Sequence, residues 1–189
     1  MKLKKYSILK NSKIVFKDYS IIPLRKSDIQ KIRIWRNEQM NILRQTTTLS
    51  VKDQLNYYNK FIKKSFYDNK PNIILFSFML DKNCIGYGGL VHIDWDLKSA
   101  EISFINNTDR SKSKIVYEKD LSIFLKLVSN IAFDDLKLNK ITTETYDVRP
   151  WTIMILEKLG FKRVKILKNH VTIDNKLYDS ILHYKFINT

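Results

Sequence analysis

The sequence predicts a mixed α/β (α+β) fold, in which strands and amphipathic helices share one core. Residues 73–105 read as three strands separated by short turns, the pattern of an antiparallel meander. Residues 136–161 read as a strand, a tight loop and a short capped helix, the pattern of an α/β unit. At 189 residues with 44% apolar side chains, the chain suits one core, so we expect a single domain over residues 1–189.

The N-terminal third predicts a hairpin followed by two helices. Residues 13–24 are rich in β-branched and aromatic side chains up to Pro23, which favours an opening strand or hairpin. Ser27 or Asp28 is placed to cap the next helix. A second helix is expected over Ser50–Phe66, with Ser50 as its cap and apolar residues on one face.

The meander predicts strands over residues 73–80, 84–93 and 100–105, joined by polar turns. The middle strand holds three of the four glycines in the chain: Gly86, Gly88 and Gly89. Their spacing is not that of a dinucleotide-binding loop. Glycines within a strand indicate a bulge or a close approach of a ligand to the backbone.

The C-terminal half predicts a polar loop over residues 106–119, and then a long helix that Asp120 caps and that runs to about Leu136. A strand over residues 141–146 leads to a helix that starts at Pro150. Gly160 ends this helix in the left-handed conformation, with Phe161 packing back on Leu156. A last hairpin turns near Asp174 and Asn175.

Composition limits the classes of partner. The net charge of +15 favours a phosphate-bearing partner, but the excess is mostly dispersed lysine, which disfavours a nucleic acid and leaves small anions. No apolar run spans a membrane and no signal segment is recognisable, so we expect a cytoplasmic protein. Cys84 is the only cysteine and reads as a buried, inert thiol. His92, His170 and His183 lack metal-ligand spacing, so no metal site is expected.

The run ILEKLGF at residues 155–161 resembles the last conserved motif of the GNAT superfamily of N-acetyltransferases, and IGYGGL at residues 85–90 resembles its third strand. The opening, with its triplet Trp35-Arg36-Asn37 and with Ser50 followed by Gln54, is similar to one GNAT branch. That branch contains ribosomal-protein-alanine acetyltransferases and nucleotide-amino-sugar N-acetyltransferases. The resemblance implies the GNAT fold, a mixed, mostly antiparallel twisted sheet of about seven strands flanked by about four helices, and acetyl-CoA as co-substrate.

The resemblance also implies where acetyl-CoA binds. Family members hold the pyrophosphate on backbone N–H groups of a glycine-containing loop that enters the long helix, because a helix start offers unpaired donors. Here that loop is expected at residues 115–121, which contain no glycine and carry two acids. This indicates either a reshaped loop or a weakened coenzyme site, and we favour the reshaped loop. The residues implied in coenzyme binding are Phe104, Ile105, Asn106, Lys114, Tyr117, Glu118, Lys119, Asp120, Arg149 and Thr152.

The same resemblance suggests catalytic and acceptor residues. Glu101 corresponds to a strand carboxylate that acts as general base in many members; the alternative is a salt-bridged structural residue. The usual general acid, a tyrosine, is replaced by Leu156, which leaves Tyr87 and Tyr117 as substitutes with structural readings of their own. The residues expected at the acceptor are Trp35, Arg36, Asn37 and His92, although Trp35 also suits the core and Arg36 a carboxylate partner.

The leading functional hypothesis is acetyl transfer to a small anionic acceptor, a nucleotide-linked amino sugar of surface polysaccharide synthesis. The WRN opening, the YEKDL segment and the LYDSILHYKF ending carry this choice by resemblance. An enzyme acetylating an N-terminal alanine, as on ribosomal proteins, is the alternative within the family. A catalytically silent GNAT-like binding module is the alternative from another class. We expect a monomer or homodimer.

Overall fold

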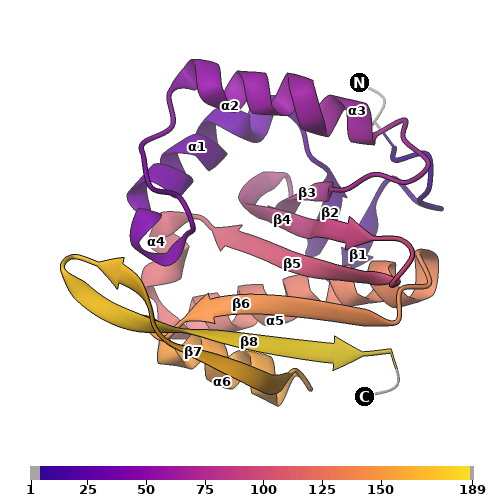
Figure 1. The fold of residues 1–189 in the computed structure, drawn as a ribbon. Coiled ribbons are helices and arrows are strands. Elements are labelled where there is room, and N and C mark those ends of the chain that lie inside the picture. The colour runs from indigo at the N-terminus through magenta and orange to yellow at the C-terminus, as the bar shows by residue number, and fades with distance from the viewer. Residues whose placement is uncertain (1–4, 188–189) are drawn as a thin grey trace.

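The computed structural model describes residues 5–187, so both ends of the expected 1–189 domain lie outside it. The described residues form one eight-stranded sheet in the order β1-β2-β3-β4-β5-β6-β8-β7. Helices α1 to α3 lie on one side of this sheet and α5 and α6 on the other (Figure 1). Every neighbouring pair is antiparallel except β5 and β6, which are parallel.

The strands are β1 (Ile14–Phe16), β2 (Tyr19–Pro23), β3 (Ile74–Leu80), β4 (Asn83–Asp94), β5 (Ser99–Asn106), β6 (Lys140–Tyr146), β7 (Lys162–Ile173) and β8 (Lys176–Phe186). The α-helices are α1 (Ile29–Glu38), α2 (Val51–Tyr57), α3 (Lys63–Ser65), α4 (Thr108–Lys112), α5 (Lys114–Asn130) and α6 (Pro150–Lys158). Two π-helical stretches extend α2 and α5, Tyr58–Ile62 and Ile131–Asp135, and two short 3₁₀ turns flank α1, Lys26–Asp28 and Met40–Ile42. The predicted fold class is confirmed, with eight described strands where about seven were expected.

Two helix starts test the capping predictions. Ser50 caps α2 as predicted, and its hydroxyl accepts from the Asp53 backbone N–H at 3.1 Å in a capping box. Asp28 makes no capping bond. Its buried carboxylate instead accepts from Arg25 at 2.6 Å and from the Ser77 hydroxyl at 2.7 Å, which ties the start of α1 to β3.

The core beneath β4 requires a glycine. A Cβ on Gly88 would lie 2.1 Å from the Ser103 carbonyl oxygen and 2.9 Å from the ring of Phe124, which packs against Phe104 in a tilted arrangement at 4.5 Å between ring centroids. Gly88 therefore permits a close approach of backbone and ring, not of a ligand. Cys84 on the same strand is buried, and burial raises the pKa of its thiol to about 12, as expected of an inert cysteine.

The C-terminal unit confirms the predicted turn chemistry. Gly160 has φ 86°, and the Phe161 N–H donates to the Leu156 carbonyl at 3.0 Å, which gives the predicted Schellman ending of α6. The final hairpin turns at Asp174 and Asn175, both with positive φ. Over residues 5–187, no helix is both long and apolar enough to cross a membrane.

Candidate active site

The candidate site is a cleft where β5 and β6 part. The two strands pair only from Ser99–Glu101 to Lys140–Thr142. Beyond that point β5 stays paired with β4, whereas β6 stays paired with β8, so the two parallel strands diverge toward their C-terminal ends (Figure 1). The side chains around this divergence enclose a cleft of about 370 Å³.

Different elements form the two ends of the cleft. Helices α5 and α6 line one part of it with Tyr117, Leu121, Leu125, Thr152 and Leu156. The opposite part is lined from the α1 side, from α2 and from β4 by Arg36, Arg44, Tyr57, Tyr87 and His92. Glu101, the last residue of β5 that pairs with β6, lies between these two parts.

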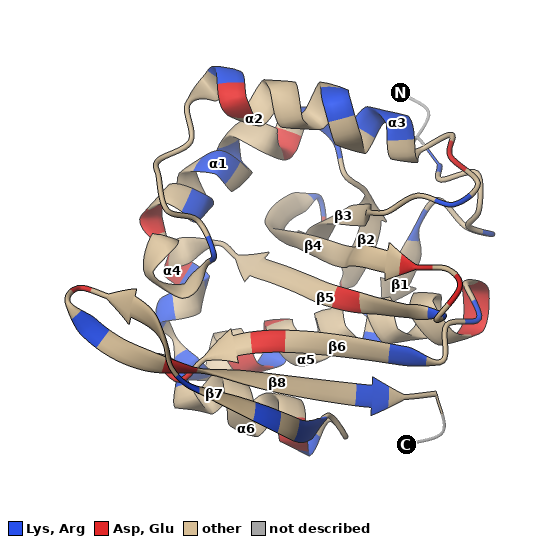
Figure 2. Cartoon of the chain, in the orientation of Figure 1, with Lys and Arg blue, Asp and Glu red and all other residues tan. Residues whose placement is uncertain are grey.

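Two carboxylates share one arginine at the point of divergence. Figure 2 shows one acidic segment on β5 and one on β6; these are Glu101 and Glu144, whose side chains are 18% and 17% exposed. Glu101 accepts from the Arg44 guanidinium, and Glu144 lies 3.6 Å from the same group. Because Glu101 pairs with Thr142 and side chains alternate, Glu101, Glu144 and Tyr146 share one face of the sheet. Burial, and then Glu144, raise the pKa of Tyr146.

Of the four expected acceptor residues, Arg36 and His92 line the cleft. Arg36 donates to the Tyr87 hydroxyl at 2.6 Å and to the Gln45 side chain at 3.0 Å, and within residues 5–187 it has no carboxylate partner. The alternative in which Arg36 pairs with a carboxylate is therefore wrong. Trp35 lies in the core, and Asn37 bonds both backbone groups of Leu49, so these two side chains hold α1 and the segment after it in place.

Arg149 and Thr152, at the start of α6, present polar atoms without partners. Arg149 lies over the Tyr117 ring at 5.7 Å and approaches the Gln39 side-chain oxygen at 3.4 Å. Its Nη1 and the Thr152 Oγ1 are both buried and make no hydrogen bond with the described residues. Unpaired buried polar atoms are costly, so their presence in a cleft indicates a site for a polar ligand.

The predicted loop over residues 106–119 is wrong, because most of it is helical. Asn107 caps α4 and Ser113 caps α5, so the long helix begins at Lys114 and not at Asp120. The residues expected to form the pyrophosphate loop, 115–121, therefore lie in the first two turns of α5. The predicted cap, Asp120, is fully buried inside that helix.

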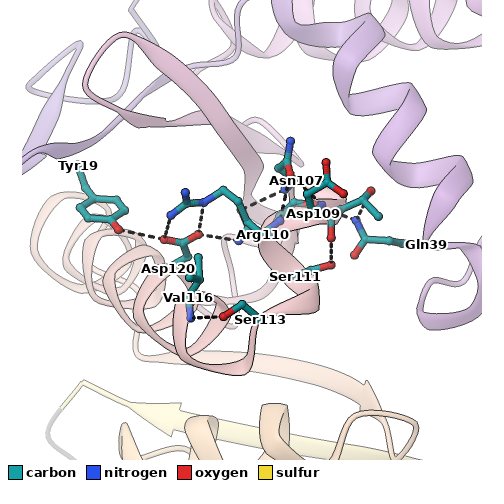
Figure 3. A network of polar contacts seen from close by, with 11 residues as sticks. Tyr19, Gln39, Asn107, Asp109, Arg110, Ser111, Ser113, Val116 and Asp120 are labelled. Atoms are coloured by element: carbon teal, nitrogen blue, oxygen red, sulfur yellow. Dashed lines mark hydrogen bonds and ion pairs between the residues drawn. The ribbon is translucent and has the colours of Figure 1, made fainter.

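A polar network takes the place of the glycine-containing loop (Figure 3). Asp120 accepts from Arg110 at 2.7 and 2.9 Å, from the Asn106 side chain at 2.7 Å and from the Tyr19 hydroxyl at 3.0 Å. These bonds join α4, α5, β5 and β2 into one unit. Asp120 is therefore turned inward, and its charge meets a guanidinium instead of an incoming phosphate.

Some of the residues expected to bind the coenzyme line the cleft, and the others do not. Phe104, Tyr117, Arg149 and Thr152 line the cleft. Ile105 and Asn106 are buried outside its lining, and Glu118 is paired with Lys158 at 3.0 Å. Lys114, Lys119 and Asp120 do not line it either.

Sequence reasoning missed Arg44, Glu144 and Tyr146. Glu144 and Tyr146 lie on the same face of β6 as Thr142, and only the parallel pairing of Thr142 with Glu101 places them together, so no local sequence signal marks them. Arg44 lies in an irregular segment, where no periodicity points to it.

The cleft suits an acyl-CoA. The free side of β5 past Glu101 offers backbone groups to the amides of a pantetheine arm, and Arg149 and Thr152 offer unpaired donors beside it. The family's other usual anchor, the glycine-containing loop, is absent, so backbone donors for a pyrophosphate are confined to the first turn of α5. No group of three or more His, Cys, Asp or Glu side chains within residues 5–187 is arranged to hold a metal ion.

Comparison with known proteins agrees with this geometry. Residues 21–182 match the family described as Acetyltransferase (GNAT) domain. Among similar solved structures is a spermidine N-acetyltransferase from Vibrio cholerae in complex with CoA and spermine, with 20% identity, a TM-score of 0.77, and 92% of this chain and 98% of that chain covered. A chimera of the SpeG enzyme from Vibrio cholerae and hSSAT has 22% identity and a TM-score of 0.75, and covers 90% and 96% of the two chains.

A further solved structure, a putative acetyltransferase, has 11% identity, a TM-score of 0.70 and covers 94% and 88%. At these identities the likeness shows a shared fold. No curated protein matches the chain. The family match extends over most of the chain and through every element that forms the cleft. The chain therefore belongs to the GNAT family and is an acyl-CoA-dependent N-acetyltransferase with acetyl-CoA as its co-substrate.

Proposed function

We propose that the chain acetylates the amine of a small acceptor that also carries an anionic group, and that a nucleotide-linked amino sugar is its first candidate. One observation carries the proposal: Arg36 lines the acceptor part of the cleft and has no carboxylate partner among the described residues. A half-buried guanidinium that is held only by neutral groups gains most from an anion, which its fork of donors can bind in a bidentate manner. The phosphate of a nucleotide-linked sugar supplies that anion.

The paired carboxylates suit the amine of the same acceptor. Glu101 and Glu144 share Arg44, which is 52% exposed, so an ammonium group can replace this arginine between them. An amine attacks a thioester only after losing a proton, and Glu101 is placed to accept it, directly or through water. The resulting neutral amine forms the new C–N bond as the C–S bond breaks.

A second set of residues binds acetyl-CoA, the thioester that supplies the acetyl group. Phe104, Tyr117, Arg149 and Thr152 line the part of the cleft that suits the pantetheine arm. The pyrophosphate is assigned to the first turn of α5, where Lys114 adds positive charge. Tyr87 and Tyr117 both line the cleft and remain the candidates for the general acid that Leu156 replaces.

A polyamine is the second candidate acceptor. The carboxylate pair favours a cationic amine, and the similar Vibrio cholerae enzyme was solved with spermine. A polyamine, however, offers no anion to Arg36. The two candidates therefore predict opposite effects when Arg36 is neutralised.

The test is acetyl transfer to a nucleotide-linked amino sugar, spermidine and a peptide beginning with alanine, with wild type and Arg36→Met. For the sugar, Arg36→Met should lower kcat/KM by about 10- to 150-fold, the equivalent of a charged hydrogen bond of about 1.5–3 kcal/mol. Acetyl-CoA affinity should stay unchanged. Arg33→Met is the matched control, because Arg33 lies on the same helix and bonds Gln30 and Leu49 outside the cleft.

Each other result has a defined meaning. Faster transfer to spermidine, with Arg36→Met neutral or activating, would replace the anionic acceptor with a polyamine. Faster transfer to the peptide would favour the alanine-acetylating alternative. If acetyl-CoA produces neither calorimetric heat nor a thermal shift, the chain acts as a silent binding module.

A further inference from the structure

A bulge in β7 brings a surface histidine next to the inner wall of the cleft. Leu167 pairs with Ser180 and Val171 with Tyr178, so residues 168–170 of β7 face Asp179 alone on β8. Asp179 holds this bulge by accepting from the Asn169 backbone N–H at 3.0 Å and from Lys168 at 2.6 Å. Bulges recur beside active sites because they redirect a side chain. Here the redirected side chain is His170.

His170 is connected to the cleft through one buried hydroxyl. The His170 Nδ1 lies 2.9 Å from the Ser180 Oγ, and that hydroxyl donates to the Glu144 Oε1 at 2.8 Å. Ser180 is fully buried, whereas the His170 side chain is 48% exposed. Glu144 lines the cleft beside Arg44 and Glu101. The three side chains therefore form a continuous path from the candidate reaction site to the outer surface.

The chemistry needs such a path. Acetylation of an ammonium group releases one proton overall, because the departing thiolate takes up only one of the two that the nitrogen gives up. A carboxylate that has accepted a proton in a half-closed cleft must lose it before the next turnover. Within residues 5–187, Glu101 makes a hydrogen bond and ion pair with Arg44 alone, and a guanidinium does not accept protons.

We propose that Glu144, Ser180 and His170 carry the released proton out of the cleft. The amine gives its proton to the Glu144 carboxylate, directly or by way of Glu101. Glu144 passes a proton to the Ser180 oxygen while Ser180 gives its own to the His170 Nδ1. The imidazolium then loses the Nε2 proton to water, so that Glu144 is again a carboxylate, Ser180 an alcohol and His170 neutral. Rotation of the half-exposed ring then brings Nδ1 to water, where it releases its proton as Nε2 takes one up, and this restores the starting tautomer.

Ser180 and His170 act through Glu144 and are relay residues, not catalytic ones. Several charged or titratable groups border the path and bias its protonation. On the cleft side these are Arg44, Glu101 and Tyr146, and on the surface side Lys168, Asp179 and Asp147, whose carboxylate accepts from the Asp179 backbone N–H. The path depends on acetyl transfer itself and holds for any of the acceptors above.

The relay is tested with His170→Ala on whichever acceptor the wild type acetylates fastest. At neutral pH kcat should fall at least about tenfold, and the deficit should shrink as pH rises, because base in solution then removes the proton. Added imidazole should restore kcat in proportion to its concentration, since His170 is half exposed and its removal opens the end of the path. KM for acetyl-CoA should not change. Lys165→Ala, an exposed position on the same strand, is the control and should match wild type.

Ser180→Ala separates a relay from a structural role. It should lower kcat as much as His170→Ala, but imidazole should not rescue it, because the bridging hydroxyl is missing and the His170 Nδ1 lies 3.7 Å from the Glu144 Oε1, beyond hydrogen-bond distance. The double variant should be no slower than either single one, as expected of residues that act as a unit. Wild-type kcat in His170→Ala at every pH, a deficit that ignores imidazole, or rescue of Ser180→Ala would each overturn the relay. A wrong acceptor assignment would appear instead as wild-type turnover of a different acceptor.

Discussion

Removing the Asp120 carboxylate should destabilise the protein strongly, although the residue touches no part of the cleft. Asp120 is fully buried and accepts from Arg110, Asn106 and Tyr19, the closest contacts being 2.7 Å. In Asp120→Ala these donors lose their acceptor, and Arg110, whose side chain is only 27% exposed, becomes an uncompensated cation. Breaking a buried pair in this way costs about 3–5 kcal/mol.

The measurement is the thermal midpoint of unfolding. For a chain of this size the expected loss corresponds to a Tm about 6–20 °C below wild type, taking about 2–4 °C per kcal/mol. Asp109→Ala is the control: its pair with Lys112 is exposed, so Tm should hardly move. Arg110→Met combined with Asp120→Leu should recover much of the loss, because apolar residues leave no buried charge unpaired. If Asp120→Ala lies within about 1 kcal/mol of wild type, the network does not hold the start of α5.

Three further outcomes are expected. Glu101→Gln should lower kcat at neutral pH by about 10²–10⁴, with partial recovery at high pH and unchanged acetyl-CoA affinity; full activity across pH would make Glu101 structural. Burial lowers the pKa of His183 in the folded protein below its ordinary value of 6.5. As the pH falls through that value, His183 therefore takes up a proton in the unfolded chain before it does so in the folded protein. Tm should therefore fall as pH drops below about 6.5, and less steeply in His183→Gln; equal slopes would contradict this. Gly88→Ala should destabilise more than Gly86→Ala, because the added Cβ would lie 2.1 Å from a backbone oxygen in the first case and 2.8 Å in the second; the reverse order of Tm would refute the close packing.

Most of the fold was predictable because the residues that specify each strand, helix and turn lie within that element. The β-branched run at residues 141–146, Pro150 and Gly160 each carry a local signal. The structure has strand β6, the start of α6 and the left-handed residue after α6 at these three positions. The prediction of a loop over residues 106–119 was wrong because the helices there have little apolar periodicity. What holds these helices is the contact of Asp120 with Arg110 and with a tyrosine that lies 101 positions away, and no local window contains that pair.

The site was predictable where a motif marked it and not elsewhere. Glu101 and Arg149 were singled out by family resemblance, and both line the cleft. Glu144 sits in a strand that reads as half-buried, and only the parallel register sets it beside Glu101. The Ser180 and His170 contacts depend in addition on a bulge, whose unpaired residues cannot be counted before the partner strand is known.

Strand β8 connects these features, although the cleft is lined by its neighbour β6 and not by β8 itself. It pairs with β6 from Lys140 to Tyr146, which holds that strand away from β5 after the first three residues and so keeps the cleft open. The same pairing sets Ser180 opposite Tyr146, and therefore diagonally next to Glu144 on one face. Because one strand both holds the cleft open and supplies the hydroxyl that contacts Glu144, substitutions on β8 can change catalysis without touching a substrate.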